Sequence, residues 1–228
     1  VRNETGTYIV TSEHRNLQLK TKGSVVLANI GSGVSMTIYQ ATVSITDPVF
    51  PFIAFRSSGG LVGVTTDYSG GSFFATFYGP AAETVSWYIF DIVPPPPAGA
   101  GFGMQVFNAA GDVTFDTSLG PLRLAGISQM PGPDFQTSDL SVTYPAGRTY
   151  AAIHSHAGLV TDADGSPGSY TNRYAITMSR WSGTTLIGRF SFVDAPSTSI
   201  FLDFSDVPPV NSWANKHPAI LVADVTGL

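Results

Sequence analysis

The stretch Ser44–Pro48 reads SITDP, and Ser141–Pro145, 97 residues later, reads SVTYP. After one inserted residue, Phe52–Ser57 (FIAFRS) aligns with Tyr150–Ser155 (YAAIHS). These matches occur in the same order in both parts of the chain. Because chance rarely preserves order over several segments, they predict an internal duplication with a repeat of about one hundred residues.

The two ends of the repeat also agree. At an offset of 105 residues, Leu17 and Leu19 align with Leu122 and Leu124. Each copy then ends on alternating aromatic residues that lead into proline: Tyr88, Phe90 and Pro94 in the first copy, and Phe190, Phe192 and Pro196 in the second. The residues that repeat are typical of turns and cores, which favours a shared architecture over a shared reactive centre.

Apolar and polar residues alternate with a period of two through most of the chain. Clear examples are Thr42–Thr46, Ser72–Tyr78, Thr84–Ile92, Tyr150–Ser155 and Thr185–Val193. Turns rich in glycine and serine separate these segments, and no segment keeps a period of 3.6 residues over three helical turns. The sequence therefore predicts an all-β protein built from two tandem, related β-sandwich-like units.

Residues 94–101 (PPPPAGAG) mark the clearest internal boundary. Proline cannot donate a hydrogen bond to a β-ladder and favours a stiff, extended conformation, so we interpret this segment as a linker. A ligand for an SH3-type domain is the alternative. The predicted domains are unit one at 1–97, unit two at 98–196 and a C-terminal extension at 197–228.

The C-terminal extension has no counterpart in unit one. Its segments Ile200–Leu202 and Ala219–Ala223 predict one or two further strands, which complete a sheet in either unit or in a neighbouring chain. A single fused sandwich, in which unit two begins inside a shared sheet, is an open alternative.

The composition narrows the class of protein. Only 12% of the 228 residues are charged and the net charge is −5, so no basic face for nucleic acid exists beyond the short cluster at Arg15–Lys22. The chain contains no cysteine, no run of 18 apolar residues and no charged segment followed by an apolar stretch near its start. These features predict a protein without disulfides, a membrane span or a secretory leader, made in a reducing cytoplasm.

His154 and His156 form the one pair of side chains with the spacing of metal ligands. Residues i and i+2 of a strand point to the same face, so both imidazoles can reach one ion. Two nitrogens do not close a site, whereas three chains around a three-fold axis would supply six, a set suited to iron or nickel. The aligned residues of unit one are Arg56 and Ser58, and ordinary polar residues at a strand end are the alternative interpretation.

Two further patterns bear on chemistry. Asp162–Gly165 resembles the opening of a calcium-binding loop, but Asp and Gly also dominate hairpin turns, and no glutamate follows Glu83 to act as a bidentate ligand. No Gly-x-Ser-x-Gly elbow precedes a helix, and the aspartates show no spacing typical of a nucleophile and its base. We therefore expect a non-enzymatic protein that carries no organic cofactor, and a metal ion is the one candidate for a bound group.

Several aromatic residues lie in or beside loops rich in glycine and serine. They are Tyr68 and Tyr170, with Trp181 and Trp213 close to similar loops. Aromatic side chains in loops offer large, rigid contact areas, which suits carbohydrate stacking or protein contacts. Tyr68 and Tyr170 are the candidate ligand-binding residues, whereas burial in the core is the alternative for the two tryptophans.

Residues 103–117 read GMQVFNAAGDVTFDT and lead into Leu122–Leu124. This stretch resembles a hairpin that recurs in tail-tip and tail-fibre-region proteins of tailed bacteriophages, in which GLxVFNxxGxxxFDS precedes a strand of alternating apolar residues. Val1–Leu19 resembles a degenerate copy of it. The Asn-x-x-Gly segment suits a tight turn, and the Asp-Thr step can satisfy backbone donors at the next bend. The resemblance covers about forty residues, implies a structural role in the virion and transfers no catalytic residue.

We therefore expect a virion protein of a phage tail tip, baseplate or fibre, made in the host cytoplasm and acting in assembly and host attachment. Its expected partners are other tail proteins and copies of itself. A trimer of two-unit chains would present six quasi-equivalent domains and match a six-fold ring to a three-fold fibre. A carbohydrate-binding module that recognises bacterial surface glycan is the alternative function.

Overall fold

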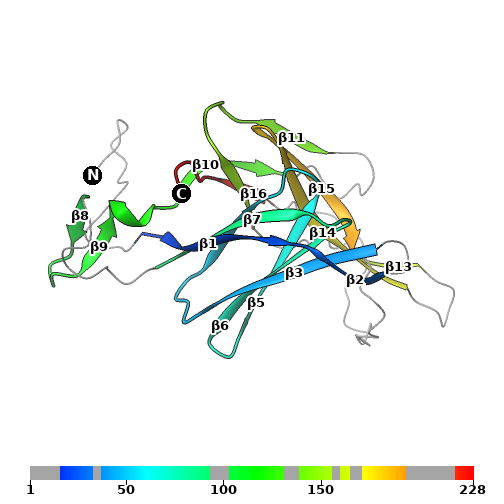
Figure 1. Ribbon diagram of the computed structural model, residues 1–228, viewed down its shortest axis with the longest axis horizontal. Coiled ribbons are helices and arrows are strands. Elements are labelled where there is room, and N and C mark those ends of the chain that lie inside the picture. The colour runs from blue at the N-terminus through cyan, green and yellow to red at the C-terminus, as the bar shows by residue number, and fades with distance from the viewer. Residues whose placement is uncertain are drawn as a thin grey trace.

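The computed structural model describes residues 16–32, 37–92, 103–130, 139–155, 160–164, 171–193 and 219–228 (Figure 1). Within these ranges the chain forms sixteen β-strands and one short 3-10 helix, η1 (Thr117–Leu119). The strands pair in an antiparallel manner throughout. The prediction of an all-β, sandwich-like protein is confirmed.

One sheet contains six strands. In spatial order they are β1 (Gln18–Val26), β7 (Thr84–Asp91), β4 (Phe52–Arg56), β12 (Tyr150–His154), β16 (Ala219–Asp224) and β10 (Arg123–Gln129). The two edges of this sheet meet at one end. There the Leu19 N–H donates to the Gly120 carbonyl (3.0 Å) and the Leu122 N–H to the Leu17 carbonyl (2.9 Å). The sheet is therefore strongly curled.

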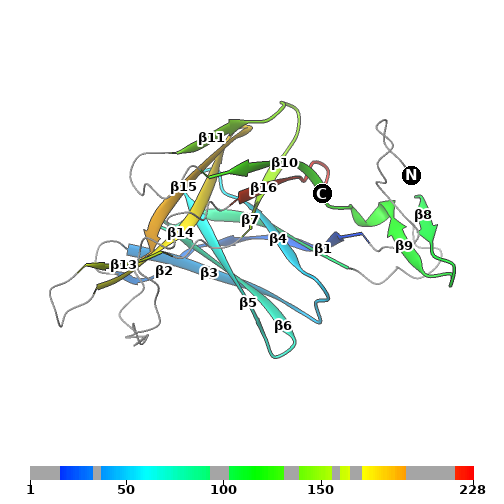
Figure 2. The same cartoon turned by 180° about the vertical axis from the view of Figure 1, so that it is seen from behind.

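The second sheet contains eight strands and lies against one face of the first (Figures 1 and 2). Seven of them follow the order β11 (Leu140–Thr143), β15 (Thr185–Val193), β14 (Thr171–Ser182), β5 (Val62–Ser69), β6 (Ser72–Gly79), β3 (Thr37–Thr46) and β2 (Ala28–Ser32). The eighth, β13 (Val160–Asp164), pairs with β14.

Two clusters of buried side chains fill the space between the sheets. In the first, Phe55 of β4 packs edge-on against Phe77 of β6, with ring centroids 5.6 Å apart. In the second, Tyr150 of β12 stacks on Trp181 of β14 at 5.9 Å. The period-two pattern explains both clusters, because it places alternate side chains of each strand on the same face.

A third cluster lies on the opposite, curled face of the six-stranded sheet. Ala54, Ala151 and Ala223 are completely buried there, beside larger side chains that include Leu19 and Leu122 from the converging edges. Small side chains suit this face because the edges of the curled sheet approach each other across it.

The strand order is mirrored about the middle of each sheet. Moving outward from the central pair β4 and β12, the six-stranded sheet continues with β7 and β16 and then with β1 and β10. From β5 and β14, the other sheet continues with β6 and β15 and then with β3 and β11. A duplicated unit would produce this order, and the duplication itself stays a prediction.

The observed order changes how the ends of the two copies align. The segment that contains Phe190 and Phe192 is β15, which occupies the position matching β6 and not the one matching β7. The position matching β7 belongs to β16, from the predicted C-terminal extension, which pairs with β10 on one side and β12 on the other. The extension therefore contributes an interior strand to the six-stranded sheet, between β12 and β10.

Strands of the two predicted units also pair with each other in both sheets. Phe55 of β4 faces Ala152 of β12, and Gly63 and Val62 of β5 face Met178 and Ser179 of β14. The described strands of both units thus share two continuous sheets, as in the fused alternative. The Pro-rich segment at 94–101 lies outside the described residues.

The faces of β4 and β12 correct one detail of the alignment. Phe55 belongs to the first interior cluster and Ala152 to the second, so these two residues, 97 apart, occupy matching inward positions. A shift by one residue would turn every side chain to the other face. In this register the predicted duplication needs no inserted residue, and it aligns His154 with Ser57 in place of Arg56.

A separate hairpin stands outside the two large sheets. It consists of β8 (Gln105–Phe107) and β9 (Val113–Asp116), which pair only with each other among the described strands. Figures 1 and 2 show this hairpin projecting from one end of the body, beyond η1.

Candidate functional site

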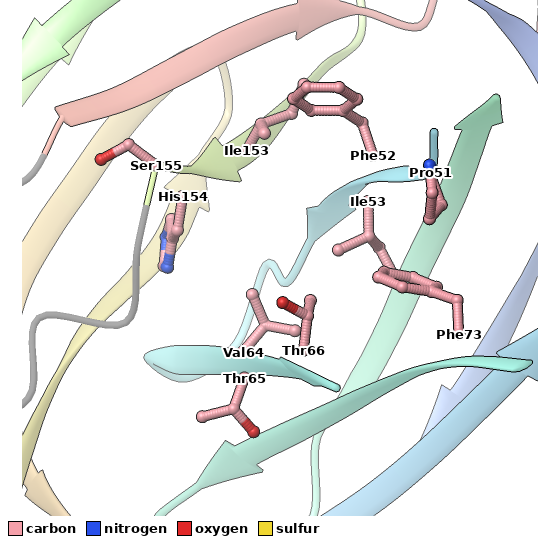
Figure 3. A pocket seen from close by; sticks show the side chains of 10 residues that line it. All are labelled: Pro51, Phe52, Ile53, Val64, Thr65, Thr66, Phe73, Ile153, His154 and Ser155. Atoms are coloured by element: carbon pink, nitrogen blue, oxygen red, sulfur yellow. The ribbon is translucent and has the colours of Figure 1, made fainter. Parts of the chain in front are cut away.

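A cavity among the described residues lies where the two halves of the molecule meet, namely the strands of predicted unit one and those of predicted unit two with β16. The ladder between β4 and β12 contains a single residue pair, Ala152 with Phe55, and the strands separate beyond it. A cavity of about 410 Å³ opens at this point. It is lined by Pro51, Phe52, Ile53, Val64, Thr65, Thr66, Phe73, Ile153, His154 and Ser155 (Figure 3).

The described residues that line this cavity include no acidic, lysine or arginine side chain. Figure 3 shows Ile53, Phe73 and Val64 directed toward its interior, with the His154 ring on the opposite side. The Ser155 hydroxyl turns away from the cavity and accepts from the Ala219 N–H (3.1 Å). Thr66 points inward, whereas the neighbouring Thr65 points to the other face of β5, as alternation along a strand requires. The cavity therefore has an apolar side and an uncharged polar side.

His154 is the one ionisable residue that lines the cavity. Its Nε2 atom lies 3.0 Å from the Ser179 hydroxyl oxygen, and its ring packs edge-on against Phe55 with centroids 4.8 Å apart. Burial, opposed only in part by the Thr177 backbone, lowers the pKa of His154 to about 3. The imidazole is therefore neutral at physiological pH.

The predicted metal site at His154 and His156 stays a prediction. His156 lies outside the described residues, and within the described ranges no three His, Asp or Glu side chains come together as metal ligands. Asp162 and Asp164 belong to β13, opposite Arg173 and Thr171 of β14, and the loop that follows them lies outside the described residues.

Arg56 joins the two halves through contacts that the sequence does not indicate. Its guanidinium donates to the carbonyls of Tyr150 (2.9 Å) and Gly183 (2.8 Å) and lies 5.2 Å from the ring centre of Trp181. Trp181 itself is only 1% exposed, which confirms the core interpretation for this tryptophan. Trp213 lies outside the described residues.

A buried carboxylate fixes the loop that leads into the cavity. Asp91, at the end of β7, is fully buried and accepts hydrogen bonds from the backbone N–H groups of Val49 (3.1 Å) and Phe50 (2.6 Å) and from Lys20 Nζ (3.2 Å). Lys20 also donates to the carbonyls of Thr46 and Asp47. These contacts hold the loop between β3 and β4 rigidly against the end of the sandwich.

The hydrogen bonds to Asp91 also set its protonation. Burial raises the pKa of Asp91, but the bonds from Phe50, Val49 and Lys20 outweigh it and hold the pKa below the usual aspartate value. Asp91 is therefore ionised at neutral pH, when it can hold the loop.

The clamped loop presents large apolar side chains to solvent. Val49 is 65% exposed and Phe50 57%, and Phe50 packs edge-on against the cavity residue Phe52 at 5.2 Å. Tyr68 is 58% exposed and donates its hydroxyl to the Pro48 carbonyl (3.3 Å). Tyr68 is thus an exposed aromatic beside the cavity, and its role in ligand binding stays a prediction. Tyr170 lies outside the described residues.

Asp224 occupies the corresponding place in the second half. It ends β16, is 3% exposed, and forms ion pairs with Arg148, from the loop before β12, and with Arg123 of the edge strand. Both edge strands carry a bulge at matching positions, between Leu19 and Thr21 in β1 and at the equivalent place in β10. Each half therefore uses a buried aspartate to hold the loop that precedes its central strand.

The projecting hairpin is braced at its tip and at its base. At the tip, the Asn108 side-chain oxygen accepts from the N–H groups of Ala110 (3.0 Å) and Asp112 (2.8 Å). At the base, the buried Asp116 accepts from Gln105 Nε2 (2.6 Å), and its carbonyl accepts from Gln18 Nε2 of β1 (2.8 Å). The hairpin is thus a defined structural element joined to the body.

No protein-family model matches the chain, and no match is found among the curated proteins or the solved structures compared with it. No helix in the described ranges has the length and apolar character needed to cross a membrane.

Proposed function

We propose that this protein is a non-enzymatic structural component of a bacteriophage tail tip, baseplate or fibre, and that its projecting hairpin contacts a neighbouring tail subunit. The observation that carries the proposal is the hairpin itself. Residues 103–117, which resemble the phage hairpin sequence, form an element that stands outside both large sheets.

The surface of the hairpin supports a role in protein contacts. Met104 is 47% exposed and Phe107 51%, although both are large apolar residues. Aromatic and methionine side chains are enriched in protein interfaces, and a braced element loses little conformational entropy when it binds. A preorganised hairpin with an apolar surface is therefore suited to docking on a neighbour.

The proposal is tested in particles from cells that produce the protein. Antibodies against the chain should label the tail end of these particles in negative-stain electron microscopy, and native mass measurement should give a trimer or a ring-forming oligomer of the purified chain. A protein absent from particles and monomeric at micromolar concentration would contradict the proposed role.

The contribution of the hairpin is tested separately. The double variant Met104→Ser/Phe107→Ser should keep the melting temperature of the wild type but should no longer enter particles. Val26→Ser is the matched control, because Val26 is also exposed (61%) but lies at the end of β1 in the body. Equal incorporation of the hairpin variant and this control would refute the docking role.

A second candidate function is recognition of bacterial surface glycan. It is favoured by the exposed side chains of Tyr68 and Phe50, which the hydrogen bonds around Asp91 and Pro48 hold in place. Rigid exposed aromatics can stack on sugars at a low entropic cost. Tyr68→Ala should then weaken binding to host cells without lowering stability, and unchanged cell binding would argue against this candidate.

A further inference from the structure

We infer that the cavity between β4, β12 and β5 is a binding site for one neutral sugar ring. Its volume of about 410 Å³ falls within the range of small-molecule sites, about 300–1,000 Å³. The inference deepens the second candidate function, glycan recognition, and does not depend on the structural role, since the isolated protein can bind a sugar whether or not it enters a particle.

The apolar side of the cavity suits the hydrocarbon face of a sugar ring. Ile53, Val64 and Phe73 point into the interior, and they come from both sheets, so they form a wall and a floor (Figure 3). A pyranose carries C–H groups on its two faces, and these pack against aliphatic and aromatic side chains. This surface supplies contact area but fixes no orientation by itself.

The polar side of the cavity can provide the orientation. The Thr66 hydroxyl points inward and makes no hydrogen bond within the described part of the chain, so it is available to a ligand (Figure 3). His154 lies across the cavity from the apolar wall, whereas the Ser155 hydroxyl turns away from the cavity and accepts from the Ala219 N–H (3.1 Å) (Figure 3). Hydroxyl groups at the rim of a sugar ring both donate and accept hydrogen bonds, as the Thr66 hydroxyl and the neutral His154 ring do.

The described lining residues favour a neutral ligand. A charged ligand would lose hydration on entering the cavity and would find no opposite charge among these described residues. His154 cannot supply one, because its buried ring stays neutral at physiological pH. A neutral sugar avoids this cost, whereas a uronic or sialic acid does not.

Exposed aromatics extend the apolar wall beyond the cavity. Tyr68 lies directly opposite Phe73 across the β5–β6 pair, and Phe50 packs against Phe52. A second sugar unit, attached to the ring in the cavity, would therefore meet the exposed rings of Tyr68 and Phe50. The cavity and these two residues together suit the end of a neutral glycan chain.

The test uses the purified full chain and the methyl glycosides of glucose, galactose, N-acetylglucosamine and rhamnose as neutral probes, with glucuronic acid as the charged probe. Backbone amide NMR titration should show at least one neutral sugar shifting resonances at Val64, Thr66 and His154. The same titration with glucuronic acid should show no saturable shift.

Two threonine substitutions, one inside and one outside the cavity lining, locate the site. Thr66→Val removes the inward hydroxyl and should weaken the binding of that sugar roughly three- to ten-fold, the loss expected for one hydrogen bond. Thr84→Val is the matched control, because Thr84 is an exposed threonine of β7 outside the cavity lining, and this variant should leave the dissociation constant unchanged.

Three results would each overturn the inference. They are no saturable binding of any neutral probe at millimolar concentration, equal binding of glucuronic acid, and equal losses in Thr84→Val and Thr66→Val. None of them bears on labelling of particles by antibody, so failure of the sugar site and failure of the structural role remain distinguishable.

Discussion

Replacing Asp91 with asparagine tests how the loop between β3 and β4 is held. The carboxylate is fully buried and receives hydrogen bonds from the backbone of Val49 and Phe50 and from the ammonium group of Lys20. Asparagine has nearly the same shape, keeps one acceptor oxygen and loses the charge. The substitution therefore removes the ion pair and one acceptor without creating a cavity.

The size of the effect follows from the burial of the two partners. Removing one member of a buried ion pair costs about 3–5 kcal/mol, because the other charge is left without compensation. The Lys20 side chain is 24% exposed, so water can partly solvate its ammonium group in the variant. We therefore expect a loss near the lower end, about 3 kcal/mol, which lowers Tm by roughly 6–12 °C in a chain of this length.

Equilibrium unfolding in urea and thermal unfolding provide the measurement, with Asp139→Asn as the matched control. Asp139 also pairs with a cation, Arg189 (2.7 Å), but both side chains are substantially exposed, at 41% and 55%. Exposed ion pairs contribute about 0–1 kcal/mol. If Asp91→Asn lowers the free energy of unfolding no more than Asp139→Asn does, the buried clamp is not a main source of stability.

The same pair of variants has a pH signature. The pKa of Asp91 is lower in the folded state than in the unfolded chain, so its stabilising contribution is complete above the unfolded value of about 3.9 and is lost as the pH falls through the folded pKa. The wild type should therefore lose stability steeply below about pH 4. Asp91→Asn should show a shallower decline over the same interval.

Two further predictions concern contacts between the halves. Arg56→Lys should lower the free energy of unfolding by about 1–2 kcal/mol, because lysine cannot donate to the Tyr150 and Gly183 carbonyls in the same planar geometry or stack equally on Trp181. Unfolding followed by tryptophan fluorescence measures this loss. A loss no larger than that of the exposed control Lys22→Arg would refute the prediction. Gly63→Ala should cost about 1–3 kcal/mol, because a Cβ atom there would collide with Ile176 and lie 3.0 Å from the Thr177 carbonyl oxygen. In thermal unfolding, the added variant Ile176→Val should restore part of the lost Tm, and no recovery would show that the clash lies elsewhere.

Local patterns predicted the strands well because alternation in a strand is a property of neighbouring residues. The segment Ser72–Tyr78 was expected to be half-buried, and β6 buries Phe73, Ala75 and Phe77 on one face. The aromatic residues before proline misled the alignment of the repeat ends. Phe190 and Phe192 resemble the end of β7 in composition, but β15 occupies another position because its place is set by pairing with β11 and β14.

The candidate sites show the same difference between features set by neighbouring residues and features set by distant contacts. A strand pattern and a glycine-rich turn were enough to predict an exposed aromatic at Tyr68. No local pattern indicates that Asp91 binds Lys20, 71 residues away, or that Arg56 reaches Gly183, 127 residues away. The sequence does not indicate the cavity either, because it forms where the ladder between β4 and β12 stops after one residue pair.

The sequence by itself therefore determined the all-β class, the strand segments and the repeat that suggests two related halves. The tertiary structure alone decided that strands from both halves share two sheets, that β16 from the C-terminal segment lies within one of them, and that His154 faces a cavity. The physical reason is that alternation and turn propensity act between near neighbours. The pairing of strands and the burial of charge depend on residues that meet only when the chain has folded.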